Sequence, residues 1–250
     1  MAKLTRYLQN IGINGITKET QEKLFCAKVI VMGAGALGSG VIMNLAALGI
    51  GQIKIIDDKV VDEEDLNSQL IHKYKNIGRA KVISAKDWIS DFNPDIKVEI
   101  EKTRLNELNY FNVIENYDII VDCFNGIETK YMLNEIALRH NKILIHGYTQ
   151  GFIGQATTVI PGKSACLSCI KQKPAMLEIE TYPSIASVNS VISSILSQEV
   201  LKVLMGGCEL LTNKLLLFDG YKTGFKIFEC TKNIACPACK DIKEYGKIQI

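Results

Sequence analysis

The chain has 250 residues, 47% of them hydrophobic and 22% charged, with a formal net charge of +2 at pH 7. This length and composition allow one large α/β core, and the small net charge argues against a nucleic-acid partner. No apolar run is suited to crossing a membrane, and the opening residues, MAKLTRYLQNIG, lack the apolar segment of a secretory signal. We therefore expect a cytoplasmic protein with no membrane partner.

Predicted strands and helices alternate along the first part of the chain. A helical arm, 1–27, contains a polar helix over 16–25 with Thr17 as its N-cap. Strands are predicted at 28–32, 52–57, 96–101, 117–122 and 142–146, and helices at 36–48, 80–92 and 127–140. This alternation implies a Rossmann-like, mainly parallel sheet with helices on both faces.

The last third of the chain follows a different pattern. Residues 151–160 begin with glycines and continue with β-branched residues, which is typical of an antiparallel addition to the sheet. An irregular crossover segment at 170–183, a helix at 184–205 and strands at 214–218 and 224–229 follow. We interpret 1–250 as one domain: the arm, a nucleotide-binding core at 28–150, and a sheet extension with crossover loop and zinc clamp at 151–250.

A glycine-rich turn, GAGALG at Gly33–Gly38, lies between the first predicted strand and its helix. Gly33 would permit the tight turn, Gly35 the approach of a phosphate, and Gly38 the packing of helix against strand. The helix that begins at Ala36 adds free N–H donors and partial positive charge. Asp57, at the end of the second strand, is placed to accept ribose hydroxyls. The alternative is a glycine turn kept for packing alone.

Four of the eight cysteines form two C-x-x-C pairs, Cys166/Cys169 and Cys236/Cys239. In a chain without a secretory signal, close cysteine pairs are more often metal sites than disulfides. Four thiolates suit a structural Zn²⁺ and leave no open coordination position. Four unligated thiols or another soft metal remain alternatives. The other cysteines are interpreted as small buried apolar residues; they are Cys26, Cys123, Cys208 and Cys230. The three histidines are interpreted as ordinary packed or surface residues; they are His72, His140 and His146.

Residues 57–86, DDKVVDEEDLNSQLIHKYKNIGRAKVISAK, resemble the ThiF/MoeB/HesA enzymes, which carry Asp-x-x-x-Val, Asn-Leu-x-Arg-Gln and Gly-x-x-Lys. RYLQNIG, GAGALG, DCFNG and both cysteine pairs extend the resemblance over nearly the whole chain. It implies ATP and Mg²⁺ rather than NAD, and a homodimer. The implied reaction is adenylation of the C-terminal carboxylate of a small ubiquitin-like sulfur-carrier protein or a peptide. It also implies that Asp57 holds the ribose, that Gln69 contributes to nucleotide binding, and that Lys81 reaches the phosphates.

The chain departs from the family pattern at four positions. Gln9 and Ser68 stand where the family has arginine, Asp65 where it has asparagine, and Asn125 where it has aspartate. If positions 65 and 125 both face the Mg²⁺–triphosphate region, Asp65 has taken over the metal role. The resemblance therefore makes Lys81, Asp65 and Asn125 the catalytic candidates.

Two other functions remain open. The missing arginines and aspartate also suit a catalytically degenerate member that serves as a non-catalytic subunit or binding module. A NAD(P)-dependent oxidoreductase is disfavoured by the zinc clamp. The 170–183 segment contains no cysteine, so we expect adenylation without thioester transfer.

Overall fold

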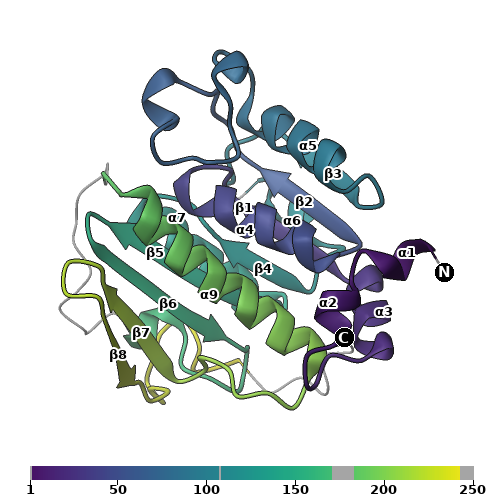
Figure 1. Ribbon diagram of the computed structural model, residues 1–250. Coiled ribbons are helices and arrows are strands. Elements are labelled where there is room, and N and C mark those ends of the chain that lie inside the picture. The colour runs from purple at the N-terminus through teal and green to yellow at the C-terminus, as the bar shows by residue number, and fades with distance from the viewer. Residues whose placement is uncertain (1, 107, 171–182, 243–250) are drawn as a thin grey trace.

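Eight strands form one continuous sheet in the computed structural model, which describes residues 2–106, 108–170 and 183–242 (Figure 1). Their order across the sheet is β3-β2-β1-β4-β5-β6-β7-β8. The strands are β1 Lys28–Met32, β2 Gln52–Ile56, β3 Lys97–Glu101, β4 Ile119–Asp122, β5 Ile143–Gln150, β6 Ile153–Val159, β7 Lys214–Asp219 and β8 Gly224–Glu229. The first five are parallel and the last three add antiparallel pairs, which confirms the predicted mainly parallel sheet with an antiparallel extension.

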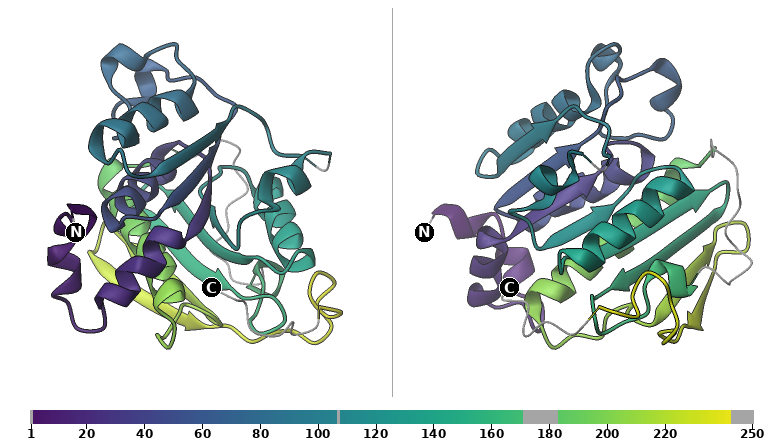
Figure 2. Two further views of the ribbon diagram at one scale, coloured as in Figure 1. Left: turned by 90° about the vertical axis from the view of Figure 1, so that its right-hand side faces the viewer. Right: turned by 180° about the vertical axis from the view of Figure 1, so that it is seen from behind.

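Helices cover both faces of this sheet (Figures 1 and 2). The helices are α1 Ala2–Thr5, α2 Leu8–Ile11, α3 Lys18–Cys26, α4 Ala36–Leu48, α5 Lys81–Phe92, α6 Tyr110–Ile114, α7 Ile127–Arg139, α8 Leu167–Ile170 and α9 Ala186–Met205. One apolar cluster joins α3, α4, α5 and α9 to one face, and a second joins α6 and α7 to the other. The alternating period of a strand explains this division, because Val29 and Val31 of β1 belong to the first cluster and Ile30 and Met32 to the second.

Most predicted elements agree with the structure to within a few residues. Thr17 caps α3, since its hydroxyl oxygen accepts a hydrogen bond from the Thr20 amide at 3.2 Å. β5 is longer than predicted and runs on to Gln150, because its second half pairs with β6. The short helices α6 and α8 were not predicted. Apart from its two end residues, the predicted crossover segment lies outside the described residues.

The interpretation of the four cysteines outside the two C-x-x-C pairs as buried residues was wrong in part. Cys123 and Cys230 are buried, but Cys26 is exposed and Cys208 is half-buried. Cys26 is the last residue of α3, a mostly polar helix on the periphery, and Cys208 follows the end of α9.

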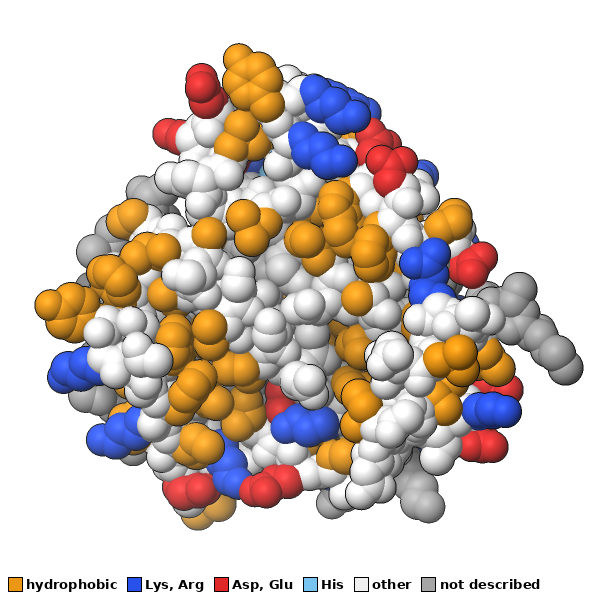
Figure 3. Space-filling view, viewed as in Figure 1, with side chains coloured by type: hydrophobic (Ala, Val, Ile, Leu, Met, Phe, Trp, Pro, Cys, Tyr) orange, Lys and Arg blue, Asp and Glu red, His pale blue; other side chains and the backbone are white. Residues whose placement is uncertain are grey.

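The face in Figure 3 has few charged side chains over its middle, where α9 crosses the sheet. The reason lies in the sequence of α9, whose exposed residues include Ser187, Ser194 and Gln198. No helix in the described parts of the chain has the length and apolar character that a membrane span requires.

Candidate functional site

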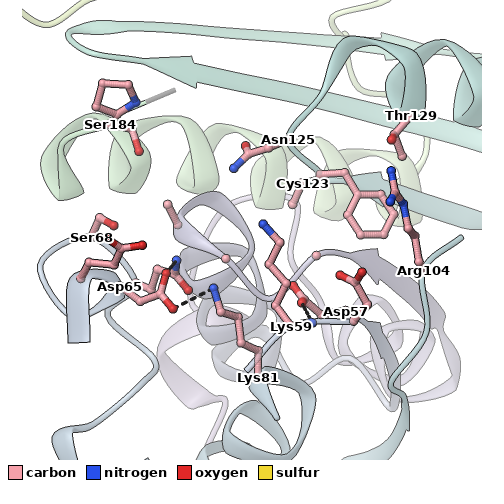
Figure 4. A pocket seen from close by; sticks show the side chains of 18 of the residues that line it. Asp57, Lys59, Asp65, Ser68, Lys81, Arg104, Cys123, Asn125, Thr129 and Ser184 are labelled. Carbon is pink, nitrogen blue, oxygen red and sulfur yellow. Dashed lines mark hydrogen bonds and ion pairs between the residues drawn. The ribbon is translucent and has the colours of Figure 1, made fainter. Parts of the chain in front are cut away.

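A cavity of about 710 Å³ opens where the carboxyl ends of the parallel strands meet (Figure 4). Gly33 follows β1, Asp57 follows β2 and Cys123 follows β4, and all three line the cavity. The chain reverses its direction of progress across the sheet between β1 and β4. Such a reversal is where open α/β sheets bind ligands, because the loops on either side diverge and leave a crevice.

The glycine-rich turn forms one wall of this cavity. Gly33 has φ +108°, a conformation that favours glycine. A Cβ at Gly38 would lie 1.9 Å from the Gly33 carbonyl oxygen, so the helix α4 approaches its own turn more closely than any larger residue allows. A Cβ at Gly35, in contrast, would meet nothing within 4 Å. Close packing explains why glycine is present at Gly33 and Gly38, whereas the backbone at Gly35 leaves open space on the cavity side.

Asp57 holds this turn in place. Its side chain is only 7% exposed. One carboxylate oxygen accepts a hydrogen bond from the Ala34 amide at 2.8 Å, and the other accepts from the Lys59 amide at 2.9 Å. The sequence predicted a ligand role for Asp57 and did not reveal this structural one. A carboxylate has about four acceptor positions, so both roles are compatible.

Lys81 and Asp65 form an ion pair inside the cavity wall. The Lys81 amino group lies 2.9 Å from the Asp65 carboxylate, and the Lys81 side chain is only 6% exposed. Gln69 also donates its side-chain amide to Asp65, and the Asp62 backbone amide donates at 2.9 Å. Lys81 is therefore not a solvated surface cation, although it lies on the first turn of a helix. Among the described residues, the buried Gln69 side-chain oxygen has no hydrogen-bond partner, so this wall offers a hydrogen-bond acceptor.

The positions that sequence reasoning paired, Asp65 and Asn125, line the same cavity. Figure 4 shows them on different walls, with Asp65 beside Lys81 and Asn125 following β4. The Asp65 carboxylate is already engaged by Lys81, Gln69 and a backbone amide. Its metal role stays a prediction. Ser68 lines the cavity as well, whereas Gln9, on α2, does not.

Two further cations line the cavity and were missed in the sequence. They are Lys59, two residues beyond Asp57, and Arg104, three residues beyond the end of β3. Among the described residues, neither side chain has an ion pair or a hydrogen bond, and Figure 4 shows both directed into the cavity. Their distance from a strand end was a usable signal, because residues just beyond parallel strands gather at one edge of the sheet.

A buried ionic group lies beneath the cavity. The Nδ1–H of His146 on β5 donates to Asp122 at 2.7 Å, and Lys130 of α7 donates to the Gly147 carbonyl at 2.9 Å. Burial alone would raise the pKa of Asp122, but the Lys130 charge and the His146 hydrogen bond outweigh it and lower that pKa. Burial, together with the Lys130 charge, lowers the pKa of His146. Asp122 also accepts the Phe124 amide at 3.1 Å, and so fixes the start of the loop that carries Asn125.

Cys123 lies beside this ionic group and faces the cavity, but its thiol is poorly suited to nucleophilic attack. Burial, and then the charge of Asp122, raises the pKa of Cys123 well above its ordinary value. The thiolate is the reactive form. The interpretation of Cys123 as an apolar residue is therefore consistent with its surroundings.

The two cysteine pairs meet within the second apolar cluster. The sulfur atoms of Cys166, Cys169, Cys236 and Cys239 all lie within 4.8 Å of one another. The sulfur–sulfur distances are 3.8 Å for Cys166–Cys169, 3.8 Å for Cys166–Cys236 and 3.5 Å for Cys169–Cys239. Four sulfurs bound to tetrahedral zinc at about 2.3 Å would lie about 3.8 Å from one another, which is close to these values. Burial raises the pKa of Cys166 and Cys239, so these thiols stay protonated until a cation displaces the protons.

Comparison with known proteins agrees with this geometry. Residues 7–238 match the ThiF family. The SAMP-activating enzyme E1 of Haloferax volcanii is 32% identical over 95% of this chain and 89% of its own length. The sulfur carrier protein adenylyltransferase of Thermus thermophilus is 30% identical over 96% of this chain and 92% of its own length. A structure of the microcin C7 biosynthetic enzyme MccB with N-formylated MccA has a TM-score of 0.85 and 22% identity, over 94% of this chain and 74% of that one. The protein is therefore a member of the ThiF family.

Proposed function

We propose that this protein is an ATP-dependent adenylyltransferase that activates the C-terminal carboxylate of a small ubiquitin-like sulfur-carrier protein or a peptide. One observation carries the proposal: the cavity brings the open glycine turn, the buried Lys81 and the cations Lys59 and Arg104 to one place. A triphosphate needs such an arrangement of N–H donors and cations. The two curated relatives, named as enzymes that act on SAMP and on a sulfur carrier protein, support the choice of substrate.

In this reaction the substrate carboxylate attacks the α-phosphorus of ATP. A new carboxylate–phosphorus bond forms, the bond to the bridging oxygen of pyrophosphate breaks, and pyrophosphate leaves with that electron pair. The Gly35 and Ala36 amides and Lys81 would bind the phosphates, and Asp57 would accept the ribose hydroxyls. Lys59 and Arg104 would supply the positive charge that the family draws from the positions of Gln9 and Ser68.

The cavity has the donors that Mg²⁺ requires. Four carboxylates, Asp57, Asp58, Glu64 and Asp65, line it together with the Asn125 amide. Oxygen ligands of this kind, with phosphate oxygens, are the usual environment of Mg²⁺. Asp65 and Asn125 would hold the ion against the triphosphate, where Mg²⁺ supplies charge neutralisation of the phosphates. Zinc, held by the four cysteines, would have no open position and would serve the structure only.

The proposed substrate class, oligomeric state and location rest on the likeness to known proteins and on the cysteine content of the chain. A peptide substrate is supported by the likeness to MccB, whose structure contains N-formylated MccA. The family resemblance supports a homodimer, and the content of eight cysteines supports a reducing, cytoplasmic location. The absence of cysteine from 170–183 favours release of the acyl-adenylate without a thioester.

ATP–pyrophosphate exchange with purified protein tests the proposal. Exchange should require Mg²⁺ and a carrier or peptide that ends in a free carboxylate, and amidation of that terminus should abolish it. ATP binding would be measured in parallel by calorimetry. If ATP binds only at millimolar concentrations and no carrier or peptide supports exchange, the protein is a non-catalytic binding module and the proposal is wrong.

A further inference from the structure

His72 lies beneath the glycine turn and is used by no step of the proposed reaction. Its side chain is only 6% exposed. The Nε2 atom lies 2.9 Å from the Ala34 carbonyl oxygen, and the Nδ1 atom lies 2.9 Å from the Ser84 hydroxyl oxygen. Both ring nitrogens of a buried histidine are thus engaged, one by the turn and the other by the helix α5.

These two contacts define the tautomer of the ring. A carbonyl oxygen can only accept a hydrogen bond, so Nε2 must carry the proton and donate it to Ala34. Nδ1 is then the acceptor and the Ser84 hydroxyl donates. Burial lowers the pKa of His72, while the Ala34 hydrogen bond opposes the shift and the Lys81 charge adds to it. The ring is therefore neutral near pH 7, as this assignment requires.

The bond to Ala34 fixes the direction of the next amide. In a planar trans peptide, the carbonyl of one residue and the N–H of the following residue point in opposite directions. The Ala34 carbonyl points to His72, so the Gly35 N–H points away from it, on the side where Gly35 lines the cavity. Among the described residues, the Gly35 N–H has no acceptor, which leaves it available to a phosphate oxygen.

The same side chain also links the two phosphate-binding elements. Ser84 lies one helical turn beyond Lys81 on α5, so the His72 ring connects the glycine turn to the helix that carries Lys81. Asp57 meanwhile holds the Ala34 amide at 2.8 Å. Both polar groups of Ala34 are thus fixed by buried side chains before any nucleotide arrives.

We propose that His72 is a positioning residue for nucleotide binding, whose Nε2–H holds the Ala34 carbonyl so that the Gly35 N–H is aimed at a phosphate of ATP. The proposal rests on the proposed function, since ATP is the ligand that the turn would receive. Preorganised donors of this kind bind without the cost of ordering them at the moment of binding.

Two substitutions separate the two hydrogen bonds of His72. The amide nitrogen of glutamine can occupy the place of Nε2, and that of asparagine the place of Nδ1. His72→Gln should therefore retain the bond to Ala34, and its KM for ATP in the exchange assay should stay within about threefold of the unsubstituted protein. His72→Asn loses the bond to the Ala34 carbonyl, so the Gly35 N–H is no longer held towards the phosphate. Its KM should rise by about tenfold or more, as expected when one hydrogen bond to an anion is lost. The value of kcat should change less than KM in both variants.

A purely structural role predicts a different pattern. The two variants would then lose thermal stability and activity together, and an equal rise in KM for both would overturn the proposal. Nitrogen-15 NMR of labelled histidine provides a readout that does not depend on activity or on variants that fold. It should show His72 protonated at Nε2 alone, and protonation at Nδ1 would also overturn the proposal. If the unsubstituted protein binds no ATP while His72 has the expected tautomer, the proposed function is wrong, and the positioning role is wrong with it. If His72→Asn shows normal exchange with an unchanged KM for ATP, only the role of His72 is rejected.

Discussion

The cavity and the four-cysteine cluster are held in place by different kinds of interaction. In the cavity, Asp57, His72 and Lys81 each have hydrogen-bonding or ionic partners that the fold supplies. In the cluster, the four sulfurs lie mainly against one another, and burial favours the protonated thiols of Cys166 and Cys239. The residues around the cavity are therefore held in place by the fold itself, whereas the cysteine cluster has the geometry of a site that a cation would stabilise.

The two regions also differ in which segments of the chain they bring together. The walls of the cavity come mostly from loops that follow β1, β2, β3 and β4, at one edge of the parallel sheet. The cluster joins α8 to a segment beyond β8, so it closes a long loop around the antiparallel extension. Loss of the cluster should then loosen the extension and leave the parallel sheet folded.

The largest effect is expected from removal of the metal. Structural zinc sites contribute about 10–16 kcal/mol of binding free energy in small peptides, so zinc loss should lower the melting temperature strongly. Purified protein should contain one zinc ion per chain by elemental analysis. Cys236→Ser or a strong chelator should remove it, and Cys26→Ser, at an exposed cysteine outside the cluster, is the matched control. A metal-free protein with the same melting temperature would show that the four thiols are only packed together.

Lys81→Ala should have the next largest effect, and on activity. The substitution removes a phosphate-binding cation and leaves Asp65 without its partner in a site of low exposure. Loss of one such electrostatic contact typically lowers kcat by about 100-fold or more. Lys86→Ala is the matched control, because Lys86 lies on the same helix but is exposed. Equal exchange rates in the two variants would remove Lys81 from the proposed mechanism.

Substitutions of Asp65 test how its carboxylate is used, for binding of Mg²⁺ or for positioning of Lys81. Asp65→Ala should abolish ATP–pyrophosphate exchange, whether the carboxylate holds Mg²⁺ or positions Lys81. Asp65→Asn retains an acceptor for the Asp62 amide but loses the charge. We expect it to lose most of its activity as well, with a higher Mg²⁺ requirement. If the asparagine variant exchanges at the normal rate, Asp65 contributes only the shape of its loop.

The sequence was sufficient for features that depend on local spacing. The glycine turn, the helix cap at Thr17 and the two cysteine pairs are each set by residues a few positions apart, and the structure has them where they were expected. The partners of Asp57 and Lys81 were not predictable in the same way. Asp57 faces Ala34 only because β1 and β2 are neighbours, and Asp65 meets Lys81 across a loop of irregular conformation.

The buried ionic group beneath the cavity was missed for a related reason. Asp122, Lys130 and His146 come from β4, α7 and β5, and nothing in their separation along the chain marks them as partners. Lys130 is only 2% exposed, although lysine side chains are almost never fully buried unless they are paired. Its long side chain reaches the Gly147 carbonyl, with the amino group over the Tyr148 ring. Such contacts follow from the packing of α7 on the sheet and not from helical periodicity.

The smallest predicted effect is a pH dependence of stability that arises from this ionic group. Burial, with the Lys130 charge, lowers the pKa of His146 in the folded protein, whereas an unfolded histidine has a pKa of about 6.5. As the pH falls below that value, the unfolded chain binds a proton that the folded protein does not, so the free energy of unfolding decreases. The stability is fully present above the unfolded pKa and is lost towards the lower, folded pKa. Each unit of difference between the folded and unfolded pKa is worth about 1.4 kcal/mol.

His146→Asn can keep a donor to Asp122 without this titration, so its stability should fall less between pH 7.5 and 5.5 in denaturant unfolding. Acid also protonates zinc-bound thiolates, but that loss is common to both proteins. Equal losses would therefore assign the acid sensitivity to groups that both proteins share, which include the cysteine cluster and His72, whose pKa burial also lowers.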